Sequence, residues 1–174
     1  MFRTPEAAAF SAAWRVLCES TLTPHYRTVF QQLSPDLIPR LIVAELIEPD
    51  KYTIRFMGTA RAQTWGAELT GKDILSLMAP HVAAAARKNM TTMLGHPCGM
   101  YYTVSFVTPS GREALTEHVT FPASNDPGLP QRLINFAEEI STLAYNEPRG
   151  QIQDISERHW IDVGVGVPVK PPIK

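Results

Sequence analysis

Glu117 stands out chemically in this sequence, because it places an acidic group within an apolar pattern. It shares the strand phase of Leu115 and Val119, so a straight strand would turn its carboxylate toward the covered side of a sheet. A buried carboxylate without a partner is costly, and it acquires a partner, shifts its pKa or meets a polar ligand. The position therefore makes Glu117 a candidate for a polar contact inside a pocket. The favoured interpretation is a local bulge or an exposed edge that turns Glu117 to solvent, since bulges are common at sheet edges.

His118 follows Glu117, and an acid beside a histidine is a combination that general acid–base catalysis uses. Neighbouring residues of a regular strand face opposite sides of the sheet, so these two side chains cannot form one dyad. We expect no catalytic residues. A small α+β pocket enzyme of the isomerase or dehydratase kind stays as an alternative function.

Metal chemistry is not expected. The five histidines and the two cysteines, Cys18 and Cys98, include neither Cys-x-x-Cys nor His-x-x-x-His spacing. Two cysteines are too few for a disulfide framework, and the N-terminal residues do not read as a secretion signal. We expect a cytoplasmic protein with reduced thiols and no metal site.

Composition narrows the class of protein further. A chain of 174 residues with 44% hydrophobic residues can form one domain with its own core. A formal net charge of -1 does not provide the concentrated positive charge that attracts a phosphate backbone. No stretch approaches the ~20 apolar residues that span a bilayer. The sequence therefore predicts neither nucleic-acid binding nor membrane insertion.

The elements that must position these residues follow from apolar periodicity. Residues 5–19 form an amphipathic helix whose stripe of Phe10, Trp14 and Leu17 needs a partner. A second substantial helix begins at Pro80 and carries its own apolar stripe. A β-branched, almost wholly apolar run predicts a strand at residues 41–47, and alternating apolar residues predict strands at residues 52–57, 100–107 and 112–121. Residues 132–140 are also strand-like, although a pair of glutamates leaves a helix as the alternative.

Together these elements predict an α+β fold with a five-stranded antiparallel sheet and helices on one face. Residues 1–33 form an N-terminal helical cap, and residues 34–145 form the sheet domain. Residues 146–174 are expected to be a C-terminal extension that is partly disordered.

Two motifs follow one another at the end of the second predicted strand. The first, R-F/L-x-G-T, is matched by Arg55, Phe56, Gly58 and Thr59. The second, G-x-E/D-L-T-G, is matched by Gly66, Glu68, Leu69, Thr70 and Gly71. In this order the two motifs resemble a subfamily of bacterial stand-alone domains in the PAS superfamily. The likeness covers residues from about 34 to about 140.

The resemblance implies a five-stranded antiparallel sheet, helices over one face, and a pocket between them that senses small molecules or contacts proteins. Catalysis is rare in that superfamily. The motif residues themselves are expected to shape the fold. Gly58 allows a close backbone approach, Thr59 can cap the next helix, and Gly71 permits a positive φ angle.

Residues that could line such a pocket are mostly aromatic or apolar, with one polar anchor. They are Phe56, Trp65, Met90, Tyr102, Phe106 and Glu117. The cofactor stays unknown. Haem binds to some members of the superfamily and needs an axial side chain, for which His81 and His118 are the candidates. His81 is expected at the shoulder of a helix, and His118 is expected to point away from the core.

These observations predict a PAS-type sensory or signalling module that binds a small, mostly apolar ligand or a protein partner without catalysis. A ligand-free dimerisation adaptor is a further alternative. The uncovered apolar stripe of the N-terminal helix predicts a homodimer, or docking of a separate signalling protein, through that helix.

Overall fold

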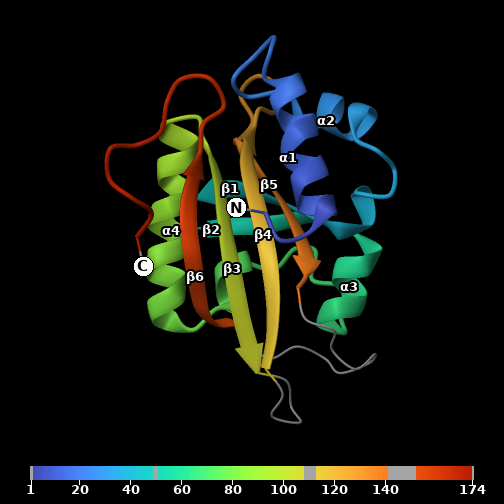
Figure 1. The fold of residues 1–174 in the computed structure, drawn as a ribbon, viewed down its shortest axis with the longest axis vertical. Helices are drawn as coiled ribbons and strands as arrows, with labels where there is room; N and C mark the ends of the chain where they lie inside the picture. The colour runs from blue at the N-terminus through green and yellow to red at the C-terminus, as the bar shows by residue number, and fades with distance from the viewer. Residues whose placement is uncertain (1, 49–50, 108–112, 141–151, 174) are drawn as a thin grey trace.

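A computed structural model describes residues 2–48, 51–107, 113–140 and 152–173, apart from the side chains of residues 106, 107 and 113. Figure 1 shows a sheet with helices on two sides of it. The helices are α1 (Pro5–Leu17), α2 (Tyr26–Gln32), α3 (Thr59–Trp65), α4 (Pro80–Gly95) and the short 3-10 helices η1 (Ile38–Arg40) and η2 (Ile74–Leu77). The strands are β1 (Leu41–Glu48), β2 (Lys51–Met57), β3 (Gly99–Val107), β4 (Glu113–Ala123), β5 (Arg132–Glu139) and β6 (Ile152–Ile161).

The strands form one antiparallel sheet in the order β2-β1-β5-β4-β3-β6. The predicted α+β fold is confirmed, and β1 to β5 lie where the apolar pattern of the sequence predicts strands. Helices α3, η2 and α4 pack over one face of these five strands. This is the arrangement that the resemblance to the PAS superfamily implies.

The predicted number of strands is one too few, because β6 adds a sixth strand beside β3. This strand lies in the segment that the sequence placed in a partly disordered extension. Its buried residues Ile152 and Ile155 are three positions apart, and a register shift follows them, so the period of two that indicates a strand is broken. The predicted boundary after residue 145 lies outside the described residues.

The face under α4 holds one of two hydrophobic clusters. Tyr102 and Val104 of β3 point into it, together with Ile42 of β1. Val82 and Met90 reach it from α4. These contacts hold α4 against this face of the sheet. Figure 1 shows α4 alongside β6.

The opposite face holds the second cluster, which is built on α1 and α2. Trp14 stacks on Phe121 with 4.8 Å between ring centroids, and Phe10 stacks on Phe136 at 5.2 Å. Both α1 aromatic side chains have no exposed surface. The expectation of helices on one face therefore holds only for α3, η2 and α4, since the cap covers the other face.

This packing removes the basis on which the sequence predicted that α1 docks a second copy or a partner. The stripe of Phe10, Trp14 and Leu17 is buried against the chain's own sheet and presents no apolar surface. Sequence periodicity shows that a helix needs an apolar partner, but not whether the partner is in the same chain.

Two motif glycines have the roles expected of them. A Cβ atom at Gly58 would lie 2.3 Å from the carbonyl oxygen of Pro39, so only glycine allows η1 to pass so close. Gly71 has a φ of +89°. Thr59 does not cap α3, because Gly58 occupies the N-cap position and Thr59 is the first helical residue.

Replacing Trp14 with alanine removes the stack on Phe121 and opens a cavity, so it should lower the free energy of unfolding by about 3–5 kcal/mol. Urea denaturation followed by circular dichroism measures this loss. Val16→Ala is the matched control on α1, because Val16 is 62% exposed and its loss should change stability by less than about 0.5 kcal/mol. A soluble Trp14→Ala protein of unchanged stability would contradict the burial of this helix.

Candidate functional site

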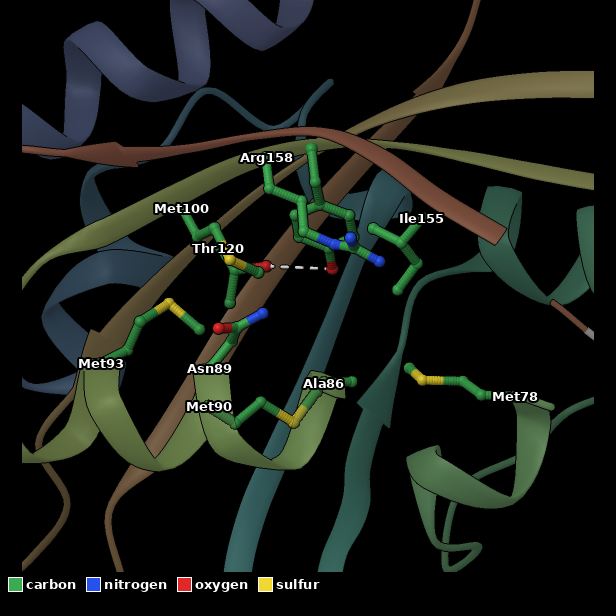
Figure 2. A pocket seen from close by; sticks show the side chains of 10 residues that line it. Met78, Ala86, Asn89, Met90, Met93, Met100, Thr120, Ile155 and Arg158 are labelled. Carbon is green, nitrogen blue, oxygen red and sulfur yellow. Dashed lines mark hydrogen bonds between the residues drawn. The ribbon is translucent and has the colours of Figure 1, made fainter. Parts of the chain in front are cut away.

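A cavity lies between α4 and the sheet. Helix α4 contributes Ala86, Asn89, Met90 and Met93 to its lining, and the residue after η2 contributes Met78. The sheet contributes Met100, Tyr102, Thr120, Ile155 and Arg158. Figure 2 shows α4 side chains pointing toward the side chains of the strands across this space.

The cavity volume is about 20 Å³. That is room for about one water molecule, whereas pockets for drug-sized ligands measure roughly 300–1,000 Å³. A haem does not fit in this arrangement of side chains. Any larger ligand has to push the lining apart.

The lining is unusually rich in methionine. Four of the chain's six methionines, Met78, Met90, Met93 and Met100, contact this one cavity. Methionine is unbranched and turns about three side-chain bonds, so it fills irregular gaps and repacks at small cost. The cavity is therefore small and has walls that can rearrange.

Polar groups on the sheet side of the cavity form a hydrogen-bonded network. The hydroxyl groups of Tyr102 and Thr120 lie 3.3 Å apart, as the dashed line in Figure 2 shows. The Asn135 amide donates to both, at 3.1 Å to Tyr102 and 2.9 Å to Thr120. All three side chains are buried, so the network satisfies polar groups that would otherwise be costly inside the protein.

His118 belongs to this network, and the expectation that it points away from the core is wrong. Its side chain is buried, and its ring stacks on Tyr102 at 4.9 Å. Nδ1 lies 3.3 Å from Asn135 Oδ1, and Nε2 lies 2.9 Å from the Thr116 hydroxyl. The amide oxygen accepts, so Nδ1 carries the proton that it donates. The sequence argument failed because it assumed one covered face, whereas β4 is covered on both.

Only some of the predicted pocket residues line the cavity. Met90 and Tyr102 line the cavity, and Trp65 packs on the same side of the sheet without lining it. Phe56 packs instead on the opposite face, where it meets Phe30. The side chain of Phe106 lies outside the described residues.

Glu117 is buried with no exposed surface, so the favoured interpretation of a bulge that turns it to solvent is wrong. Its side chain does not face the cavity either. One carboxylate oxygen accepts a hydrogen bond from the Arg3 backbone N–H at 2.9 Å. The side chain therefore lies on the face of the sheet that α1 and α2 cover, here called the N-terminal face, and points away from Met90 and Tyr102. Its hydrogen bond fixes the segment that leads into α1. Glu117 and His118 face opposite sides, as strand geometry requires, and they form no dyad.

The histidine candidates do not form a cofactor site in this structure. His81 is exposed in the first turn of α4, and His118 is engaged by Thr116 and Asn135. Among the described residues there is no group of three or more His, Cys, Asp or Glu side chains that could hold a metal ion.

Within the same residues, no helix is both long and apolar enough to cross a bilayer.

Sequence reasoning missed several lining residues, of which Asn89 and Arg158 carry the most chemistry. Asn89 lies one position from the stripe of α4, and its helical phase was a usable signal. Arg158 gave no signal, because the register shift in β6 sets its direction. Met100 and Thr120 are in strand phase with Tyr102 and His118, and could have been found by alternation.

Comparisons with known proteins give matches among solved structures only. No family model matches the chain, and no curated protein matches it. The PAS domain of BvgS from Bordetella pertussis superposes with a TM-score of 0.44 and 18% identity, over 74% of this chain and 85% of that one. An RNA-binding light-oxygen-voltage receptor superposes with a TM-score of 0.44 and 17% identity, over 57% of this chain.

The VqmA dimer of Vibrio cholerae, a LuxR-type receptor, superposes with a TM-score of 0.46 and 13% identity, over 67% of this chain. The matched regions span 28% of the RNA-binding receptor and 52% of VqmA. Structures with PAS and LOV domains are thus among those that this chain resembles. Superpositions of this kind establish neither a function nor a shared ligand, so we argue the function from the chain's own residues.

Tyr101 lies on the same face as Glu117, and its titration tests the buried carboxylate. Burial, together with the negative charge of Glu117, raises the pKa of Tyr101 to about 12, from 10.0. The neutral phenol is thus favoured in the folded state, and its contribution to stability is complete below about pH 10. That contribution is lost as the pH rises through about 12.

As the pH rises from about 10 to 12, the free energy of unfolding should fall less in Tyr101→Phe than in the wild type. Urea denaturation at each pH measures this difference. Glu117→Gln should lower the pKa of Tyr101, as followed by its NMR titration, because the carboxylate charge is removed while an acceptor for Arg3 remains. A Tyr101 pKa of about 10 in the wild-type protein would show that this face is open to water.

Proposed function

We propose that this chain is a PAS-type sensory module that binds a small, mostly apolar molecule in the cavity under α4, and that it signals without making or breaking covalent bonds. The observation that carries the proposal is the gathering of four of the six methionines around one cavity. Its polar groups, Asn89, Tyr102, Thr120 and Arg158, are few and are placed together with an apolar lining, as in small-molecule sites.

The lining also argues against catalysis at this place. Among the residues that the structure describes, the lining includes neither an acidic residue nor a histidine, and the buried acid Glu117 lies on the other face. His118 is close to Tyr102, but both of its ring nitrogens are engaged within the protein. Binding is therefore the activity that this set of side chains supports.

A route from the cavity to the surface runs through Asn89. Its side chain lines the cavity and also holds the backbone of Ile173, donating to the carbonyl oxygen at 3.0 Å and accepting from the N–H at 2.8 Å. The Trp160 indole donates to the Lys170 carbonyl oxygen at 2.8 Å. Figure 1 shows the C-terminal segment beside α4. A ligand that moves α4 would therefore displace this segment, which we propose as the output.

Methyl NMR of ¹³C-labelled methionine tests the binding site with indole as a neutral apolar probe. We expect saturable shifts of Met78, Met90, Met93 and Met100, with a smaller change at Met57, which is buried nearby but does not line the cavity. Saturation at 100 times the dissociation constant should stabilise the fold by about 2.7 kcal/mol.

The matched control is Ala86→Leu, which adds bulk on the α4 side of the cavity at a cost of about 1–3 kcal/mol. This variant should remain folded and lose the indole shifts. If indole and a panel of small aromatic and branched aliphatic compounds leave the four methyl groups unchanged, the cavity is only a packing defect and the proposed function is wrong.

The link to the C-terminal segment is tested by Asn89→Ala. Loss of both hydrogen bonds should increase amide exchange at Ile173 by about tenfold or more, because each bond contributes on the order of 1 kcal/mol. Lys88→Ala is the control, since Lys88 lies on the same helix outside the cavity lining. Unchanged exchange at Ile173 in Asn89→Ala would remove this route for a signal.

A further inference from the structure

We propose that the ligand of this cavity is a small carboxylic acid with an apolar body, and that Arg158 binds its carboxylate; this inference rests on the proposed function. The apolar body would lie among the methionine side chains. The anionic group would lie at the sheet side, where the polar groups of the lining gather.

Arg158 is available for such a contact. Its side chain is partly buried and lines the cavity, and it makes no hydrogen bond or ion pair with any residue that the structure describes. Burial lowers the pKa of its guanidinium, which shows that partial loss of water disfavours the charge. A carboxylate accepts two parallel hydrogen bonds from a guanidinium and would offset that loss.

The backbone of β6 is distorted at the point that directs Arg158. Glu157 has a φ of +46°, and it is the one residue other than glycine with a positive φ among those that the structure describes. The pairing of β6 with β3 shifts there, between the partners of Tyr101 and Thr103. This is a β-bulge, a feature that re-aims side chains and occurs next to binding sites.

The effect of the bulge is visible in the residues that reach the cavity. Ile155 and Arg158 both line it although they are three positions apart, whereas a regular strand would place every second residue there. A left-handed backbone at a glutamate is strained, because the Cβ atom crowds the following carbonyl oxygen. This chain therefore maintains a strained backbone that turns a guanidinium toward an apolar cavity.

Charge around the cavity favours an anion. Of the described residues that line the cavity, Arg158 is the one with a charge. The positive charges of both Arg61 and Arg158 act on Tyr102, lowering its pKa against the larger effect of burial, which raises it. Asp154 attracts Arg158 electrostatically, but it lies on the same strand and accepts a hydrogen bond from Ser156 at 2.6 Å.

The experiment compares phenylacetate with phenylacetamide, which have the same shape and differ in charge. Both are titrated into the full chain, and the dissociation constants are read from the methionine methyl shifts. The wild type should bind phenylacetate about tenfold or more tightly than phenylacetamide, since a charged hydrogen-bonding pair is gained. Arg158→Gln should bring the two dissociation constants within about twofold, mainly by weakening phenylacetate.

Two further variants make the result specific. Arg55→Gln removes the same charge from β2, outside the cavity lining, and should keep the wild-type preference. Arg158→Lys keeps the charge but not the planar pair of donors, so it should retain part of the preference, and it serves as the test if Arg158→Gln does not fold.

The outcomes separate the two proposals. If phenylacetate and phenylacetamide bind equally well to the wild type, the cavity binds ligands but the carboxylate inference is wrong. An equal loss of preference in Arg55→Gln and Arg158→Gln would show a general charge effect and would also overturn it. If neither compound, nor indole, shifts the lining methyl groups, the proposed function itself fails.

Discussion

The central strands of this sheet are buried on both faces, so neither face is stable in water until something covers it. From Ala114 to Ala123 of β4, Leu115 is the one side chain that is not buried. Covering one face requires α3, η2 and α4, and covering the other requires the N-terminal helices. Every other feature of the molecule, including the position of the cavity, depends on this double coverage.

Different kinds of side chain cover the two faces of the sheet. Against α1 the contact is aromatic, with Trp14 on Phe121 and Phe10 on Phe136. Under α4 four methionines line the cavity, and buried hydroxyl, amide and imidazole groups lie beside them. Stacked rings hold one geometry, whereas methionine repacks readily. The N-terminal face thus stabilises the fold, and the α4 face has the adaptable lining that recognition needs.

The sequence predicted those features of the fold that depend on residues close together in the chain. Apolar runs and alternation located the strands β1 to β5, and the phase of β3 placed Tyr102 on the cavity side. Gly58 and Gly71 were correctly assigned backbone roles, because a glycine requirement follows from local geometry. The burial of Glu117 agrees with its strand phase, although the sequence analysis favoured a bulge that turns it to solvent.

Features that depend on distant parts of the chain were not predictable. Glu117 was assigned to the wrong face because nothing in β4 shows which helices cover which side. The partner of the α1 stripe is Phe121 and its neighbours, more than a hundred residues away in sequence for Phe10 and Trp14. Arg158 could not be found, because a bulge that breaks the alternation of β6 gives it its direction.

The central claim is that recognition takes place between α4 and the sheet, in a space that enlarges around its ligand. A crystal structure of the protein with phenylacetate tests it most directly. We predict that the aromatic ring lies between the methionines of α4 and β3, with their side chains rearranged and the carboxylate on Arg158. Phenylacetate bound on the α1 face beside Glu117, or a crystal in which this space is unchanged and empty at saturating phenylacetate, would contradict the account.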